Sequence, residues 1–201
     1  QVFNERGEGV VVRGGPAQVS KNDRQPHVNT EDANALLSNA LTRYREVHGN
    51  LPARLVVHKS SKYSHEEIEG FSAALDTERV SNSDFLVLGS SSTKLFRIGG
   101  AYPPLRGTLF SLDDVEHVLY TKGSVDFFQT YPGMYIPSPI RMICASTEQT
   151  PRFLAEEILA LTKMNWNNTQ FDNAEPITLR AARQVSRVLR YCKDGARIEP
   201  R

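Results

Sequence analysis

Cysteine is scarce in this sequence, with only Cys144 and Cys192 among 201 residues. Two cysteines so far apart form neither a disulfide scaffold nor a CxxC pair of zinc ligands. No apolar run reaches transmembrane length, and the chain begins without a recognisable signal peptide. We therefore expect a cytoplasmic protein with two ordinary core thiols and no membrane partner.

Net charge and glycine-rich motifs are also lacking. The formal net charge is +1, so the overall charge does not indicate a nucleic-acid partner and any basic surface must be local. The pair Gly14-Gly15 is followed by neither GxGxxG nor GK[ST], which excludes the common phosphate-binding loops. With 39% hydrophobic residues the chain can bury one sizeable core, and no linker or repeat divides it. We expect a single domain over 1–201.

The apolar pattern predicts strands that alternate with helices. A β-hairpin is expected over Val2–Val12, then a polar loop over 16–29 and a long helix capped by Thr30. Ser64 with Glu67 reads as a capping box for a second helix. Further strands are predicted at Arg54–His58, Asp84–Leu88, Lys94–Ile98, Thr108–Leu112, His117–Thr121 and Ile140–Ala145. The order predicts an α/β fold, with a mixed sheet flanked by helices on both faces.

The most informative stretch is Ala160–Lys193, which reads as a helix, a polar loop rich in amides and a second helix after Pro176. At 100° per residue, four arginines of the second helix fall within roughly 80° of one another. We call this set the arginine strip: Arg180, Arg183, Arg187 and Arg190. The opposite arc is apolar and is predicted to be core: Ala181, Ala182, Val185, Val188, Leu189 and Cys192.

Two interpretations of the arginine strip are open from its residues. Charged helix faces are usually solvated, and these arginines could pair with Glu156, Glu157 or Asp172. Alternatively, the guanidinium groups form a cradle for phosphates, to which the amide loop adds neutral donors. Between Leu161 and Lys193, six basic residues stand against two acidic ones, and a basic strip alone is more typical of a solvated face.

The amino-acid sequence of this stretch resembles the C-terminal segment of the PIWI domain of prokaryotic Argonaute proteins; it reads LTKMNWNNTQFDNAEPITLRAARQV. The resemblance extends over nearly the whole chain and is strongest at 51–75 and 150–193. It implies an RNase-H-like fold and a PIWI domain truncated at its N-terminus, and at its C-terminus as well. It also implies a set of residues that contact nucleic acid: Lys94, Arg97, Lys163, Asn165, Asn167, Thr169, Gln170, Arg180, Arg183, Arg187 and Arg190.

By the same resemblance, the positions that carry catalytic carboxylates in the family hold residues that are not acidic in this sequence. Active Argonautes carry an aspartate where this sequence has Ser60, directly after the Arg54–His58 strand. The glutamate position falls on Val28 or Asn29, and the last position falls near Ala181 or Ala182. The first aspartate would precede Gln1. Since two-metal nucleases need several converging carboxylates, we expect no catalytic residue and no metal here. His58, in an apolar strand, is expected to be a satisfied core histidine.

The resemblance thus implies guide-directed binding of a nucleic-acid target by an inactive nuclease fold. The expected partners are a guide, RNA or DNA, its complementary target, the remaining Argonaute domains and an effector protein, to which any cutting is left. No cofactor is expected within these residues, although the intact protein could hold Mg²⁺ at the guide 5′ end. The alternative is a metal-dependent RNase-H-like endonuclease whose site is completed by residues outside this chain.

Overall fold

The computed structural model describes residues 2–4, 7–12, 14, 17–21, 23–96, 98–125, 127, 130–131, 136–164 and 174–191, with the backbone alone at 189–191. The elements run in this order: β1 (Val2–Phe3), β2 (Gly9–Val10), β3 (Gln18–Val19), β4 (Pro26–His27), α1 (Thr30–His48), β5 (Arg54–Lys59), α2 (His65–Glu78), β6 (Asn82–Ser90), β7 (Leu109–Ser111), β8 (Glu116–Leu119), β9 (Ile140–Ser146), α3 (Pro151–Lys163) and α4 (Ile177–Tyr191).

A five-stranded mixed sheet in the order β5-β6-β9-β8-β7 forms the centre of the fold. β5 and β6 are parallel, whereas β9 pairs antiparallel with both β6 and β8. Two small hairpins, β1-β2 and β3-β4, stand apart from this sheet. The predicted α/β fold is therefore confirmed, and so is the first hairpin, where Val2 is paired with Val10.

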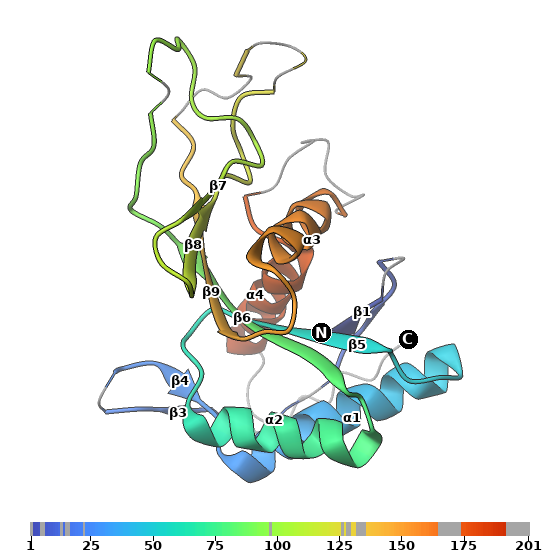
Figure 1. Ribbon diagram of the computed structural model, residues 1–201. Helices are drawn as coiled ribbons and strands as arrows, with labels where there is room; N and C mark the ends of the chain where they lie inside the picture. The colour runs from blue at the N-terminus through green and yellow to red at the C-terminus, as the bar shows by residue number, and fades with distance from the viewer. Residues whose placement is uncertain are drawn as a thin grey trace.

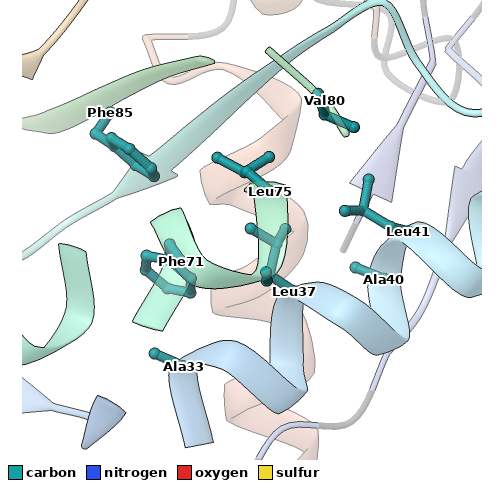
Figure 2. Close-up of a cluster of buried hydrophobic side chains, with 9 residues drawn as sticks. Ala33, Leu37, Ala40, Leu41, Phe71, Leu75, Val80 and Phe85 are labelled. Carbon is teal, nitrogen blue, oxygen red and sulfur yellow. The ribbon is translucent and has the colours of Figure 1, made fainter. Parts of the chain in front are cut away.

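β6 separates two hydrophobic cores because successive side chains of a strand point to opposite faces. Phe85 packs with α1 and α2, and Figure 2 shows it beside Phe71 and Leu75. Leu86 and Leu88 belong to the second core, which they share with β8, β9, α3 and the first turn of α4. Figure 1 shows the same division, with α1 and α2 on one side of β5 and β6, and α3 and α4 on the other.

The two helices of the first core approach closely at Gly70. A Cβ at Gly70 would lie 2.3 Å from the Thr30 carbonyl oxygen and 2.8 Å from the Ala33 Cβ. The small residues Ala33 and Ala74 are both fully buried at this contact. The close packing of α1 against α2 therefore requires glycine at position 70, which has no side chain.

One arginine ties the first two strands of the sheet to α3. Arg54 of β5 donates from Nε to Asp84 of β6 at 2.7 Å and from Nη1 to Glu157 of α3 at 2.6 Å. The second oxygen of Asp84 accepts from the backbone N–H of Glu148, at 2.8 Å. Because Asp84 is fully buried, these bonds supply the partners that a buried carboxylate requires.

Three local predictions are wrong. The segment Lys94–Ile98 is not a strand in the residues described there, and the loop predicted over 16–29 contains the β3-β4 hairpin. The cap of α1 is Asn29 instead of Thr30, since the Asn29 Oδ1 accepts from the Asp32 N–H at 2.7 Å. By contrast, the capping box of Ser64 and Glu67 and the start of α3 at Pro151 are confirmed.

Candidate nucleic-acid interface

Ser60 lies exposed directly after β5, at the carboxyl end of a parallel strand. Binding and catalytic sites of α/β proteins commonly lie at this end of the strands. By the family resemblance, Ser60 also stands at the position where active Argonautes carry an aspartate. The neighbouring side chain, Lys59, turns toward the start of α2. Its Nζ lies 2.6 Å from Glu67 Oε1 and also donates to the Lys62 carbonyl oxygen at 2.9 Å.

Lys59 belongs to a chain of charged groups that joins β4, β5 and α2. His27 contacts Glu67 through Nδ1 at 3.2 Å and Asp23 through Nε2 at 2.9 Å. The hydrogen bond to Asp23 raises the pKa of His27, against the effect of burial. Burial alone would raise the pKa of Glu67, but the bonds from Lys59 and from the Ser64 and Val28 N–H groups outweigh it and lower that pKa. Glu67 is thus an ionised carboxylate at 2% exposure.

The donor set at this end of β5 does not fit a divalent cation. Mg²⁺ prefers charged oxygen ligands, and the nearby buried carboxylate, Glu67, is already bonded to an ammonium group and two backbone N–H groups. Within the described residues, no three His, Cys, Asp or Glu side chains gather as metal ligands. Val28 offers its backbone N–H to Glu67, and Ala181 is buried on α4.

α4 is held near its start by β5 and by the segment that follows β8. The buried Thr121 hydroxyl donates to the Ala174 carbonyl oxygen at 2.7 Å, just before the helix. His58 Nδ1 and Thr178 Oγ1 are hydrogen-bonded at 2.9 Å, and burial lowers the pKa of His58 to about 4. His58 is half-buried and its ring has a hydroxyl partner, which agrees with the satisfied histidine expected on this strand.

An open hollow of about 310 Å³ lies along one face of α4 and includes most of the arginine strip. Its lining consists of Ala174, Glu175, Arg180, Arg183, Gln184 and Arg187. We call it the arginine hollow. Arg183 donates from Nη1 to Glu175, and the two side chains are 51% and 32% exposed. Three guanidinium groups, an amide and one carboxylate therefore share a solvent-accessible concavity, which can bind an extended anion.

The other predicted contact residues lie elsewhere or outside the described part of the chain. Lys94 is exposed after β6 and donates to Ser138 Oγ at 2.6 Å, while Lys163 is exposed at the end of α3. Neither lines the arginine hollow. Five of the predicted residues are outside the described residues, and so is the side chain of a sixth: Arg97, Asn165, Asn167, Thr169, Gln170 and Arg190.

The apolar arc of α4 is only partly core. Leu179 and Ala181 are buried, but Ala182 is exposed and Val188 is 55% exposed. The prediction that the whole opposite arc packs inward is therefore wrong for Ala182 and Val188. The second core takes Leu179 from the first turn of α4, and neither Ala182 nor Val188 belongs to it. The expected ion-pair partners also differ, since Glu157 pairs with Arg54, and Glu156 pairs with Arg152.

Sequence reasoning missed Glu175 and Gln184 as members of this interface. Gln184 follows Arg183 directly and shares the outer surface of the helix, so its position could have been found by winding the helix at 100° per residue. Glu175 precedes Pro176 and lies outside the helical pattern. No linear signal marks its contact with Arg183.

Comparison with known proteins gives matches among solved structures alone: no protein-family model and no curated protein matches the sequence. Aa-Ago with externally bound siRNA matches 88% of this chain and 23% of its own, at 17% identity and a TM-score of 0.64. The match to Clostridium butyricum Argonaute bound to a guide DNA and a target DNA covers 87% of this chain and 22% of that chain, at 16% identity and a TM-score of 0.64. The match to Aquifex aeolicus Argonaute covers 88% of this chain and 23% of that chain, at 16% identity and a TM-score of 0.56.

At these identities the likeness concerns the fold, and this chain spans less than a quarter of the length of each matched Argonaute. Among the described residues, no helix is long and apolar enough to cross a membrane. The mixed five-stranded sheet with helices on both faces agrees with the RNase-H-like architecture that the resemblance implies. The chain therefore has an Argonaute PIWI-like fold.

Proposed function

We propose that this chain is the PIWI part of an Argonaute protein that binds a guide strand and its nucleic-acid target without cutting the target. The observation that carries the proposal is the arginine hollow, in which Arg180, Arg183 and Arg187 line one concavity along α4. The Argonaute PIWI-like fold supports a nucleic-acid ligand for it.

The spacing of these arginines suits a nucleic-acid backbone. Arg180 and Arg187 are seven residues apart, about 10 Å along a helix that rises 1.5 Å per residue. A stacked strand advances about 3.4 Å per nucleotide, so the same length holds about three phosphates. We infer two or three phosphate contacts from α4. Guanidinium groups on phosphates fix the position of a strand and do not read its sequence.

The absence of cutting rests on the three positions at which the resemblance places catalytic carboxylates within this chain. They hold Ser60, Val28 or Asn29, and Ala181 or Ala182. The ion pair of Lys59 and Glu67 beside Ser60 supports the same proposal, because the Glu67 carboxylate is already bonded to the Lys59 ammonium group. Silencing or defence would then follow from binding itself or from a partner effector.

A salt titration of binding by the full-length protein tests the phosphate contacts. Arg183→Gln/Arg187→Gln should weaken binding of a single-stranded oligonucleotide for every sequence tried. Each lost contact should also make the plot of log K against log salt shallower by about one unit. Arg43→Gln/Arg152→Gln is the matched control, since both arginines are exposed and outside the arginine hollow.

An unchanged slope in Arg183→Gln/Arg187→Gln would show that α4 does not contact phosphates. Losses confined to particular sequences would show base readout instead. Metal-dependent cleavage of a matched target by the full-length protein would favour the alternative, a nuclease completed by residues outside this chain. Sequencing the nucleic acid that copurifies with the protein would identify the guide as RNA or DNA.

A further inference from the structure

The arginine hollow contains one acidic residue, Glu175, and its carboxylate is bonded to Arg183. Glu175 lies two residues before α4, on the segment that Thr121 anchors through the Ala174 carbonyl oxygen. Its side chain contacts Arg183, which lies about two turns further along the chain. The carboxylate oxygens therefore lie among the guanidinium groups that line the concavity.

A carboxylate and a phosphate present similar oxygen geometry to an arginine, and guanidinium forks bind either one. The position of the Glu175 oxygens thus marks a place in which a phosphate oxygen would be bound. Both cannot hold the same donors of Arg183 at once. A phosphate that takes the Arg183 Nη1 donor must displace the carboxylate, which is 32% exposed and has room to turn into solvent.

We propose that Glu175 is an internal counter-ion of the arginine hollow, which a nucleic-acid phosphate displaces when it binds. The inference rests on the proposed function and adds a regulatory element to the same site. The bound carboxylate prevents small anions from occupying Arg183, while a strand that presents several phosphates to Arg180 and Arg187 at once has enough binding energy to remove it.

Two measurable consequences follow. Without the carboxylate, binding should become about two- to fivefold tighter, which corresponds to the modest strength of an exposed ion pair. The salt dependence should also become steeper by up to about one unit, because in the wild type the release of ions is offset when the displaced Glu175 takes up a solution cation. A purely structural role for Glu175 would not change the salt slope.

The experiment measures binding of a single-stranded oligonucleotide, as DNA and as RNA, to the full-length protein over a salt series. Glu175→Gln removes the charge and keeps the shape of the side chain. Glu46→Gln removes an equal charge from an exposed pair with Arg43 on α1, outside the arginine hollow, and is the control. Thermal unfolding of each variant confirms that the fold is retained.

The variant Glu175→Gln/Arg183→Gln separates displacement from simple repulsion. If Glu175 acts by occupying Arg183, the gain from Glu175→Gln should disappear when Arg183 is already Gln. A gain of the same size in both backgrounds would mean repulsion through space and would overturn the proposal. Weaker binding by Glu175→Gln would also overturn it, since Glu175 would then position Arg183 for the ligand.

The failure of this inference is distinct from the failure of the proposed function. If Glu175→Gln binds as the wild type does while Arg183→Gln/Arg187→Gln binds more weakly, the arginine hollow binds phosphates and the counter-ion role is wrong. If no variant of the hollow changes affinity or salt slope, the phosphate site itself is wrong.

Discussion

Lys59 and Glu67 form a buried ion pair, with Lys59 Nζ 2.6 Å from Glu67 Oε1 and Glu67 only 2% exposed. Lys59→Met would leave the buried Glu67 carboxylate with its His27 contact but without its ammonium partner, so we expect the free energy of unfolding to fall by up to about 3–5 kcal/mol. Chemical denaturation measures this loss. Lys59→Met/Glu67→Gln should recover much of it, and a double variant no more stable than the single one would contradict the assignment.

The His27 side chain should make stability depend on pH. Its folded pKa is raised above 6.5, chiefly by Asp23, so its contribution is fully present below about pH 6.5 and is lost as pH rises through the folded value. The difference in unfolding free energy between the wild type and His27→Gln should therefore shrink toward higher pH. A difference that stays constant from acidic to alkaline pH would show that His27 is not protonated in the folded state.

Asp23 acts in the opposite direction at acidic pH. The backbone N–H of Gln25 and the His27 side chain lower its pKa from 3.8 to about 2, so its contribution is present above pH 3.8 and is lost as pH falls toward 2. Asp23→Asn should remove the loss of unfolding free energy that occurs as pH falls toward 2. The unfolding free energy of this variant should also change less with pH near neutrality. Denaturation of both proteins across the acidic range measures the effect.

An aspartate at position 60 alone should not produce cleavage. Ser60→Asp supplies one carboxylate beside Lys59, but the other positions implied by the family resemblance remain without carboxylates at Val28 or Asn29 and at Ala181 or Ala182. Two-metal chemistry needs several carboxylates at once. We expect the full-length variant to show no Mg²⁺- or Mn²⁺-dependent cutting of a matched target, and no rise in melting temperature when either metal is added.

The contact between α1 and α2 should tolerate no side chain at Gly70. Gly70→Ala places a Cβ 2.3 Å from the Thr30 carbonyl oxygen, so the helices must separate and we expect a loss of about 1–3 kcal/mol in unfolding free energy. Gly89→Ala on β6 is the control, because no atom lies within 4 Å of the added Cβ there. Equal losses in the two variants would exclude the helix contact as the cause.

The sequence predicts the long elements because their patterns are local. Ser64 with Glu67 starts α2 as a capping box, and the apolar run of β6 predicts a strand, whose alternating side chains put Phe85 and Leu86 in different cores. The strand predicted at Lys94–Ile98 fails for an identifiable reason. The Leu95 N–H bonds to the Tyr120 hydroxyl at 2.9 Å, so a side chain takes the place of a neighbouring strand.

The candidate site is predictable only to the extent that it lies on one helix. Winding α4 places Arg180, Arg183 and Arg187 together, as the arginine hollow confirms. The contact of Arg183 with Glu175 spans a proline, and the network of Lys59, Glu67 and His27 joins residues from three elements. Such contacts depend on the tertiary packing of the chain, for which a single sequence carries no periodic signal.

α4 is anchored near its start, so a movement there is enlarged along the rest of the helix. His58 and Thr121 hold Thr178 and Ala174, whereas Arg183 and Arg187 lie one to three turns further along a stiff rod. A small rotation at the anchor therefore becomes a larger displacement at the guanidinium groups. Under the proposed function, interior substitutions at His58 or Thr121 would shift where a bound strand lies relative to Ser60 without changing any residue that the strand contacts.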